Sequence, residues 1–98
     1  MIEIRQTDEY ERWFETLRDR AARVRIDLRI RRLSLGNPGS VEPIGEGLSE
    51  LKIDFGPGYR VYYLRQAGRY VLLLIGGDKS SQARDIRKAK ELALKYTE

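Results

Sequence analysis

The chain has 98 residues, of which 19 are Lys or Arg and 15 are Asp or Glu, and it contains neither His nor Cys. This length suits a single domain over residues 1–98, and the missing Cys and His exclude disulfides, thiolate catalysis, a Ser-His-Asp triad and the usual zinc ligands. No apolar run approaches the roughly 20 residues of a membrane span and no signal-peptide pattern opens the chain, so we expect a soluble cytoplasmic protein without a membrane partner.

The net charge of +4 is unevenly distributed along the chain. Residues 1–17 have two basic and five acidic side chains, whereas residues 18–33 have seven Arg against two Asp. Residues 50–98 have ten basic and six acidic side chains. Clustered Arg is typical of a protein that binds a polyanion, although for one helix alone a solvated charged face is the more common explanation.

The chain is expected to begin with a short strand and a helix. Ile2 and Ile4 alternate with charged residues, which indicates a strand with one buried face. Asp8 is the predicted N-cap of the helix, with Glu11 three residues later as its capping-box partner. A helical apolar stripe with Trp13 as a core anchor follows, formed by Tyr10, Trp13, Phe14 and Leu17.

A second helix is predicted from Arg20 to Leu35, ended by Gly36-Asn37-Pro38. Its apolar residues form two nearly opposite sets, which are Ala22, Ile26, Ile30 and Leu33 on one side and Ala21, Val24, Leu28 and Leu35 on the other. A helix that is apolar on two sides is either sandwiched between the sheet and the first helix, which we favour, or leaves one side for a partner.

The middle of the chain predicts a hairpin. Val41 to Gly47 is a short edge strand, and Leu48 to Phe55 alternates as a better one. Gly56-Pro57-Gly58 then turns the chain. If Phe55 pairs with Tyr59, Asp54 faces Arg60 as a candidate salt bridge and Lys52 faces Tyr62. A one-residue bulge in the turn would break this register.

The last strand and helix complete the expected fold. Tyr70 to Ile75 is continuously apolar, as in a strand that is covered on both faces. It ends at turn glycines Gly76-Gly77, after which Asp78, Ser80 or Ser81 caps a helix near residues 82–96. The pattern predicts an α+β fold, a small curved and mainly antiparallel sheet with an N-terminal helical hairpin packed on it and a C-terminal helix, in the order β-α-α-β-β-β-α.

The candidate functional residues are cations and phenols. They are Lys52, Arg60, Tyr62 and Lys79, with Arg65 and Arg84 near the rims. Such groups suit binding of a phosphodiester and stabilisation of charge on a phosphorane-like transition state. From the residues alone, plain nucleic-acid binding and catalysis are equally well supported.

The segments GPGYRVYY, VLLLIGGDKSSQ and DIRKA together resemble the RelE/ParE superfamily of bacterial toxins, and more narrowly its HigB-like "addiction module killer protein" branch. The resemblance also takes in FETL, the LGNPG loop and IGEGLSELKIDFGPGYRVYY, and thus covers nearly the whole chain. It implies the same α+β fold and the toxin of a type II toxin–antitoxin pair, which needs no metal and no cofactor.

The resemblance also implies roles for particular residues. Members that cut messenger RNA activate a 2′-hydroxyl for in-line attack on the adjacent phosphate. By motif position, Arg60 stabilises the transition state, Lys79 does the same or donates to the leaving oxygen, and Lys52 is the base or a phosphate ligand. The late Tyr of the family has no match here, because Asp85 lies near that position. The expected substrate-binding residues are Tyr62, Arg65, Asp78, Gln82 and Arg84.

The leading hypothesis is therefore a ribosome-dependent messenger-RNA endoribonuclease, neutralised by a cognate antitoxin of the helix-turn-helix type. One alternative is a ParE-like poison of DNA gyrase, which binds protein and performs no RNA chemistry. Another is a catalytically weak member that binds RNA or a partner.

Overall fold

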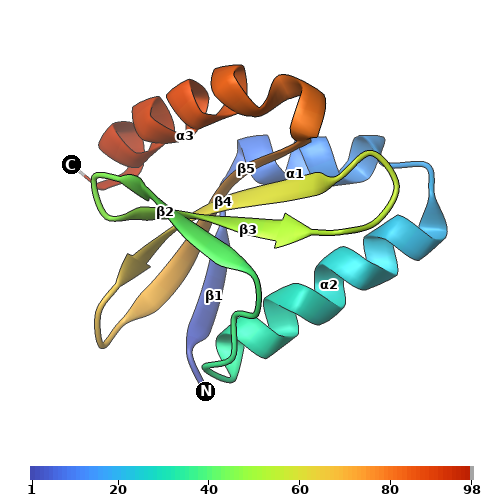
Figure 1. The fold of residues 1–98 in the computed structure, drawn as a ribbon. Coiled ribbons are helices and arrows are strands. Elements are labelled where there is room, and N and C mark those ends of the chain that lie inside the picture. Colours follow the sequence, from blue (N-terminus) through green and yellow to red (C-terminus); the bar gives the residue numbers. More distant parts are fainter. Residues whose placement is uncertain (98) are drawn as a thin grey trace.

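The computed structural model describes residues 1–97 and has the expected α+β architecture (Figure 1). Its elements are β1 (Glu3–Gln6), α1 (Asp8–Thr16), α2 (Arg20–Ser34), β2 (Val41–Gly45), β3 (Leu48–Ile53), β4 (Tyr59–Gln66), β5 (Tyr70–Asp78), a 3₁₀ turn (Lys79–Ser81) and α3 (Gln82–Thr97). Strand β2 confirms the short edge strand predicted at Val41 to Gly47, which the order β-α-α-β-β-β-α did not include, and it lies at the edge of the sheet.

The five strands form one open sheet in the order β1-β5-β4-β3-β2. β1 pairs with β5 in parallel, and every other pair is antiparallel. Helices α1 and α2 lie on one face of the sheet and α3 lies on the other (Figure 1). None of the helices within residues 1–97 has both the length and the apolar character needed to cross a bilayer.

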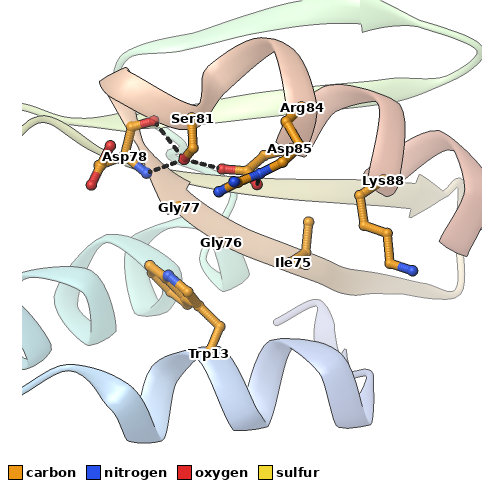
Figure 2. Close-up of a pocket in the computed structure, with 9 residues that line it drawn as sticks. All are labelled: Trp13, Ile75, Gly76, Gly77, Asp78, Ser81, Arg84, Asp85 and Lys88. Atoms are coloured by element: carbon orange, nitrogen blue, oxygen red, sulfur yellow. Dashed lines mark hydrogen bonds and ion pairs between the residues drawn. The ribbon is translucent and has the colours of Figure 1, made fainter.

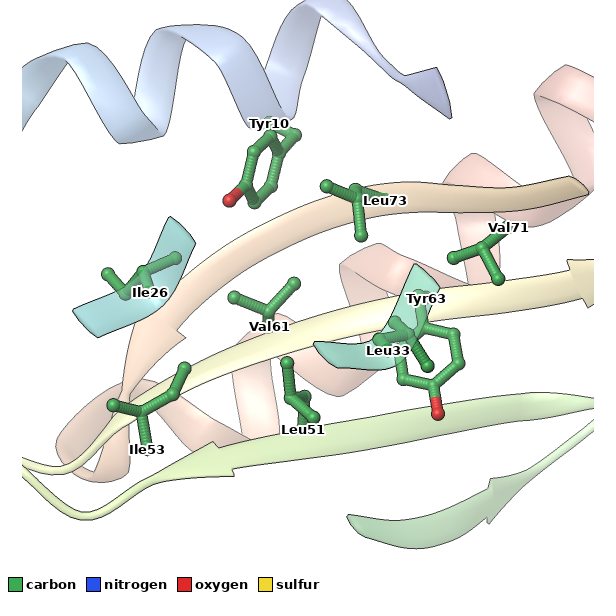
Figure 3. Close-up of a cluster of buried hydrophobic side chains, with 9 residues drawn as sticks. All are labelled: Tyr10, Ile26, Leu33, Leu51, Ile53, Val61, Tyr63, Val71 and Leu73. Atoms are coloured by element: carbon green, nitrogen blue, oxygen red, sulfur yellow. The ribbon is translucent and has the colours of Figure 1, made fainter. Parts of the chain in front are cut away.

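Each face of the sheet has its own apolar core. Successive side chains of a strand point to opposite faces, so β4 contributes Val61 to one core and Tyr62 to the other. The core beneath α1 and α2 (Figure 3) consists of Tyr10, Ile26, Leu33, Leu51, Ile53, Val61, Tyr63, Val71 and Leu73. The continuously apolar run predicted to be covered on both faces is indeed interior, because Val71, Leu72, Leu73 and Leu74 are all buried.

The N-cap of α1 is Thr7, and the prediction of Asp8 was wrong. The Thr7 hydroxyl accepts a hydrogen bond from the Tyr10 amide (2.9 Å) and donates one to the Leu74 carbonyl (2.7 Å). An ionised carboxylate accepts hydrogen bonds only, so Asp could not make the second contact. Thr7 thereby attaches the start of α1 to β5.

The predicted register of the β3–β4 hairpin was also wrong, by two residues. Tyr59 pairs with Ile53, so Lys52 faces Arg60 and Glu50 faces Tyr62. The chain leaves β3 at Asp54, and the connection of residues 54–58 is closed by hydrogen bonds from the Phe55 amide to Ile53 (2.9 Å) and from the Gly58 amide to Phe55 (3.1 Å). The expected Asp54–Arg60 ion pair is consequently absent from residues 1–97.

α2 is not sandwiched as we expected. Ala22 and Ile26 are fully buried against the sheet, but Val24, Leu28 and Leu35 on the opposite side are about half exposed. The reason is that α1 lies beside α2 on the same face of the sheet, where both fill one core, and so it cannot also cover the outer side of α2.

Gly76 and Gly77 belong to β5 rather than to a turn, and neither has a positive φ. A Cβ on Gly76 would overlap the six-membered ring of Trp13, and a Cβ on Gly77 would overlap the Asp85 carboxylate. These glycines are needed because side chains from α1 and α3 lie directly on the strand.

Candidate functional site: a cation-lined pocket

Lys52, Arg60 and Lys79 line a single pocket of about 470 Å³ at one end of the β3–β4 hairpin. We call it the cationic pocket. The other residues that line it are Arg29, Ser40, Asp54, Gly56, Pro57 and Gly58. Four cationic side chains thus surround the pocket, against the one carboxylate of Asp54. The structure brings together the three residues that the sequence singled out, and adds Arg29.

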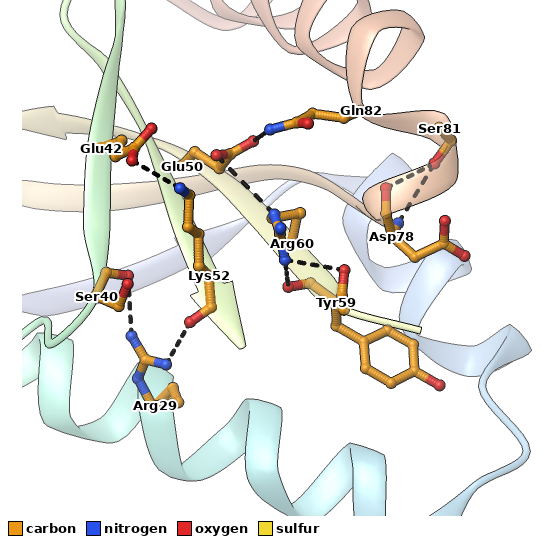
Figure 4. A network of polar contacts seen from close by, with 11 residues as sticks. Arg29, Ser40, Glu42, Glu50, Lys52, Tyr59, Arg60, Asp78, Ser81 and Gln82 are labelled. Carbon is orange, nitrogen blue, oxygen red and sulfur yellow. Dashed lines mark hydrogen bonds and ion pairs between the residues drawn. The ribbon is translucent and has the colours of Figure 1, made fainter. Parts of the chain in front are cut away.

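Arg60 is the least exposed of the three, with 12% of its side chain accessible. Its Nη1 donates to the carbonyl oxygens of Gly58 (3.0 Å) and Tyr59 (3.2 Å) (Figure 4). Its Nε lies 4.0 Å from a Glu50 carboxylate oxygen and has no hydrogen-bond partner within residues 1–97. Contacts on both sides hold the guanidinium in one orientation at the pocket.

Glu50 is a site residue that the sequence analysis missed. It is only 1% exposed and accepts a hydrogen bond from Gln82 Nε2 (2.7 Å) on α3. An alternating strand pattern places it among the outward-facing polar residues, and only the packing of α3 on that face reveals its burial. The buried Glu50 carboxylate stabilises the orientation that the Arg60 guanidinium has at the pocket. Gln82, expected to bind substrate, is used here to hold Glu50.

Lys52 is oriented by the neighbouring edge strand. Its Nζ donates to Glu42 of β2 (2.7 Å), and 29% of its side chain is accessible. Its carbonyl oxygen accepts from Arg29 Nη1, and Arg29 Nη2 reaches Pro38 (2.9 Å) and Ser40 (3.1 Å). Burial, and then the nearby charge of Arg32, lowers the pKa of Arg29. Arg29 of α2 is therefore bonded both to β3 and to the loop that precedes β2, and it connects these segments at the rim of the pocket (Figure 4).

Lys79 is exposed and stands at the first residue of the 3₁₀ turn. A Cβ on Gly58 would lie 3.4 Å from both Arg60 Nη1 and the Lys79 Cβ. The side chains of Arg60 and Lys79 therefore approach each other beside Gly58. Asp78 caps the turn by accepting from the Ser80 amide (2.8 Å), and its hydrogen bond with the Ser80 hydroxyl lowers the pKa of Asp78. Asp78 therefore shapes the corner that presents Lys79.

Asp78 and Arg84 line a second pocket, of about 480 Å³, which shares no lining residue with the cationic pocket (Figure 2). Its other lining residues are Trp13, Ile75, Gly76, Gly77, Ser81, Asp85 and Lys88. Asp85, which the sequence analysis placed near the expected late Tyr, accepts a hydrogen bond from the Ser81 hydroxyl there. That carboxylate is among the residues of this second pocket and not among those of the cationic pocket.

Tyr62 and Arg65 are not at the surface of the cationic pocket. Tyr62 is fully buried between the sheet and α3, and burial, followed by the Glu50 charge, raises the pKa of its phenol. Arg65 is exposed but lies five residues farther along β4 than Arg60, which corresponds to roughly 16 Å. Of the predicted substrate-binding residues, none lines the cationic pocket.

Removing the charge of Glu50 should be costly. We expect Glu50→Gln to lower the free energy of unfolding by about 2 kcal/mol, because Arg60 loses its buried counter-charge. Urea unfolding followed by circular dichroism measures this loss. The matched control is Glu42→Gln, which breaks an ion pair whose carboxylate side chain is 62% exposed and should cost less than about 1 kcal/mol. Equal losses for the two variants would contradict the account of Glu50.

The Tyr62 hydroxyl should contribute no stability. It is buried and makes no hydrogen bond within residues 1–97, so Tyr62→Phe removes an unsatisfied polar group. We expect the free energy of unfolding to stay the same or rise by up to about 1 kcal/mol, as measured by thermal and urea unfolding. A clear loss of stability would mean that the phenol has a partner that holds it in place.

The fold and the pocket define a small α+β domain with a cation-lined cleft. Residues 12–97 match the model of the family described as "Phage derived protein Gp49-like (DUF891)", and the chain belongs to this family, which is part of the addiction-module killer or RelE-like toxin group. A protein of Haemophilus influenzae (strain ATCC 51907 / DSM 11121 / KW20 / Rd) is 46% identical over 92 residues, which cover 94% of this chain and 93% of the relative. The description of that relative, "Uncharacterized protein", assigns it no activity.

Proposed function

We propose that this protein is the toxin of a type II toxin–antitoxin pair, in the HigB-like branch, and that it cleaves messenger RNA on the ribosome. The observation that supports the proposal most strongly is the cationic pocket, in which four cations face one carboxylate. Its volume of about 470 Å³ lies in the range of ligand pockets, roughly 300–1,000 Å³. A phosphodiester with its flanking riboses suits this charge and this size.

The proposed reaction is an in-line displacement at phosphorus. The 2′-oxygen of one nucleotide forms a bond to the adjacent phosphorus while the bond to the 5′-oxygen of the next nucleotide breaks, which leaves a 2′,3′-cyclic phosphate and a 5′-hydroxyl. The negative charge on the non-bridging oxygens increases during this step. Arg60 stabilises that charge, because its guanidinium is already oriented by Gly58, Tyr59 and Glu50.

Two protons move in the proposed reaction. Asp54 is the sole carboxylate that lines the pocket and is exposed, so it accepts the proton of the 2′-hydroxyl. Lys79, which also lines the pocket, donates a proton to the departing 5′-oxygen. Lys52, whose ammonium is held by Glu42, binds a phosphate oxygen as a cation.

Mapping the ends of a translated message tests the proposal. After brief induction of the toxin, primer extension on an abundant message should show new 5′ ends inside the coding region, and blocking translation initiation on that message should abolish them. Growth arrest without new ends, accompanied by DNA breaks and inhibition of purified gyrase, would instead identify a gyrase poison. RNA binding that weakens with salt, with no arrest and no cleavage, would identify a catalytically inactive member.

A further inference from the structure

The outer side of α2 has an exposed apolar centre. Val24, Leu28 and Leu35 are 51%, 49% and 59% exposed, and at 100° per residue they lie within about 40° of one another around the helix. We call these three residues the α2 stripe. They make up half of the large apolar side chains that are exposed within residues 1–97, the others being Met1, Leu94 and Tyr96. Exposure of three large aliphatic side chains along one side of a helix is typical of a docking surface.

Leu28 forms a ridge between two hollows. On one side, Val24 and Leu28 line a groove of about 470 Å³ that extends to Ile4 on β1. On the other side, Leu28 lines a hollow of about 250 Å³ whose other residues are Arg25, Arg29, Arg32, Ile53 and Asp54. A ridge with a hollow on either side can interdigitate with the side chains of a second helix.

Arginines flank the α2 stripe on both sides. Arg20 and Arg31 follow one edge, and Arg25 and Arg32 follow the other, all of them exposed. None of the four forms an ion pair within residues 1–97, and Arg25 makes only a stacking contact, with its guanidinium 4.5 Å from the centre of the Phe55 ring. Asp27 also lines the groove beside Arg31, so the two rims together have four arginines and one carboxylate and remain strongly cationic.

We propose that the α2 stripe and its arginine rims bind an amphipathic helix of a partner protein, with aliphatic side chains along its centre and Asp or Glu on both flanks. The stripe spans residues 24–35, or roughly 17 Å, which matches about three helical turns of a partner. Charge complementarity between acidic flanks and the arginines sets the orientation of that helix. If the protein is the proposed toxin, this partner is its antitoxin. The identity of the partner rests on the proposed function, whereas the docking of an acidic amphipathic helix does not.

The same surface is a poor match for RNA. Aliphatic side chains offer phosphate no hydrogen-bond donor, and the α2 stripe has no aromatic ring on which a base could stack. An anionic membrane remains as the competing ligand, and it is included in the test. No residue of the α2 stripe lines the cationic pocket, but the hollow beside Leu28 shares Arg29 and Asp54 with it. The groove that Val24 lines shares no residue with the cationic pocket, so a change at Val24 separates docking from cleavage.

A designed peptide tests the inference. The probe is a fluorescent helical peptide of about 18 residues, with Leu at i, i+3 and i+4 positions flanked by Glu. Fluorescence anisotropy should show saturable binding to the full-length protein and no binding of the same peptide with Lys in place of Glu. Leu28→Asp should weaken binding by about 30-fold or more. The control is Leu94→Asp on α3, where the side chain is 65% exposed and the affinity should not change.

Three outcomes would overturn the inference. They are absence of saturable binding, equal binding of the Lys-flanked peptide, and equal losses for Leu28→Asp and Leu94→Asp. Tighter binding to vesicles of anionic lipid than to the peptide, again lost in Leu28→Asp, would assign the surface to a membrane instead. Cleavage of messenger RNA by Val24→Asp, whose groove shares no residue with the cationic pocket, should equal that of the wild type. Absence of cleavage by the wild-type protein would count against the proposed function alone.

Discussion

Replacing Gly76 by alanine is expected to lower the free energy of unfolding by about 3 kcal/mol, at the upper end of what overpacking normally costs. The added Cβ would occupy space that the six-membered ring of Trp13 already fills. That ring cannot move aside easily, because it packs against Tyr10 (5.6 Å between ring centroids) and Phe14 (6.5 Å). The backbone of Gly76 is not in the left-handed region, so the effect is purely steric.

Urea unfolding of Gly76→Ala, Trp13→Leu and the double variant measures this overlap. Trp13→Leu should itself be destabilising, because Trp13 packs on the core beneath α1. In the double variant the smaller side chain at position 13 leaves room for the Cβ at position 76. The stability lost by the double variant should therefore be smaller than the sum of the two single losses by about 1 kcal/mol or more. Full additivity, or a loss below about 1 kcal/mol for Gly76→Ala alone, would contradict the close approach of α1 to β5.

Replacing Arg60 by alanine is expected to reduce the rate of RNA cleavage by about 100-fold to 1,000-fold, the range seen when one donor to a developing oxyanion is removed. The guanidinium is held at the pocket by two carbonyls and by Glu50. Because the alanine variant also leaves Glu50 without its counter-charge, it will be less stable. Rates must therefore be measured below its unfolding transition, with the fold verified by circular dichroism.

Arg60→Lys separates catalysis from stability. Lysine keeps a positive charge beside Glu50 but cannot present two parallel N–H groups to a phosphate, so we expect near-normal stability with a rate still reduced by about tenfold or more. Arg69→Ala, an exposed arginine in the β4–β5 connection, is the control for loss of one positive charge. Single-turnover rates for Arg60→Ala and Arg69→Ala that agree within a factor of about three would contradict the role of Arg60.

Much of the fold could be predicted from periodicity, and the errors have identifiable causes. The register error in the β3–β4 hairpin was two residues, and a shift of two leaves each side chain on the same face of the sheet. For this reason Lys52 and Arg60 were still correctly expected on one side. A one-residue error would have separated them onto opposite faces.

The parts of the site that could not be predicted depend on contacts between distant segments. Glu50 and Gln82 meet across the α3 packing interface, and Arg29 reaches β3 from α2. In a local pattern, a glutamate in an alternating strand or an arginine in a basic helix is indistinguishable from a solvated residue. Likewise, the side-by-side placement of α1 and α2 decides that Leu28 is exposed, and no local pattern contains that information.

The central claim is that the positive charges of the cationic pocket act together on RNA, and cleavage by a triple variant tests it most directly. In a purified translation reaction, the wild type should produce new 5′ ends and Lys52→Ala/Arg60→Ala/Lys79→Ala should produce none. A second triple variant, Arg12→Ala/Arg69→Ala/Arg87→Ala, removes the same charge from exposed positions outside the pocket and should cleave like the wild type. Undiminished cleavage by a folded Lys52→Ala/Arg60→Ala/Lys79→Ala protein would contradict the account.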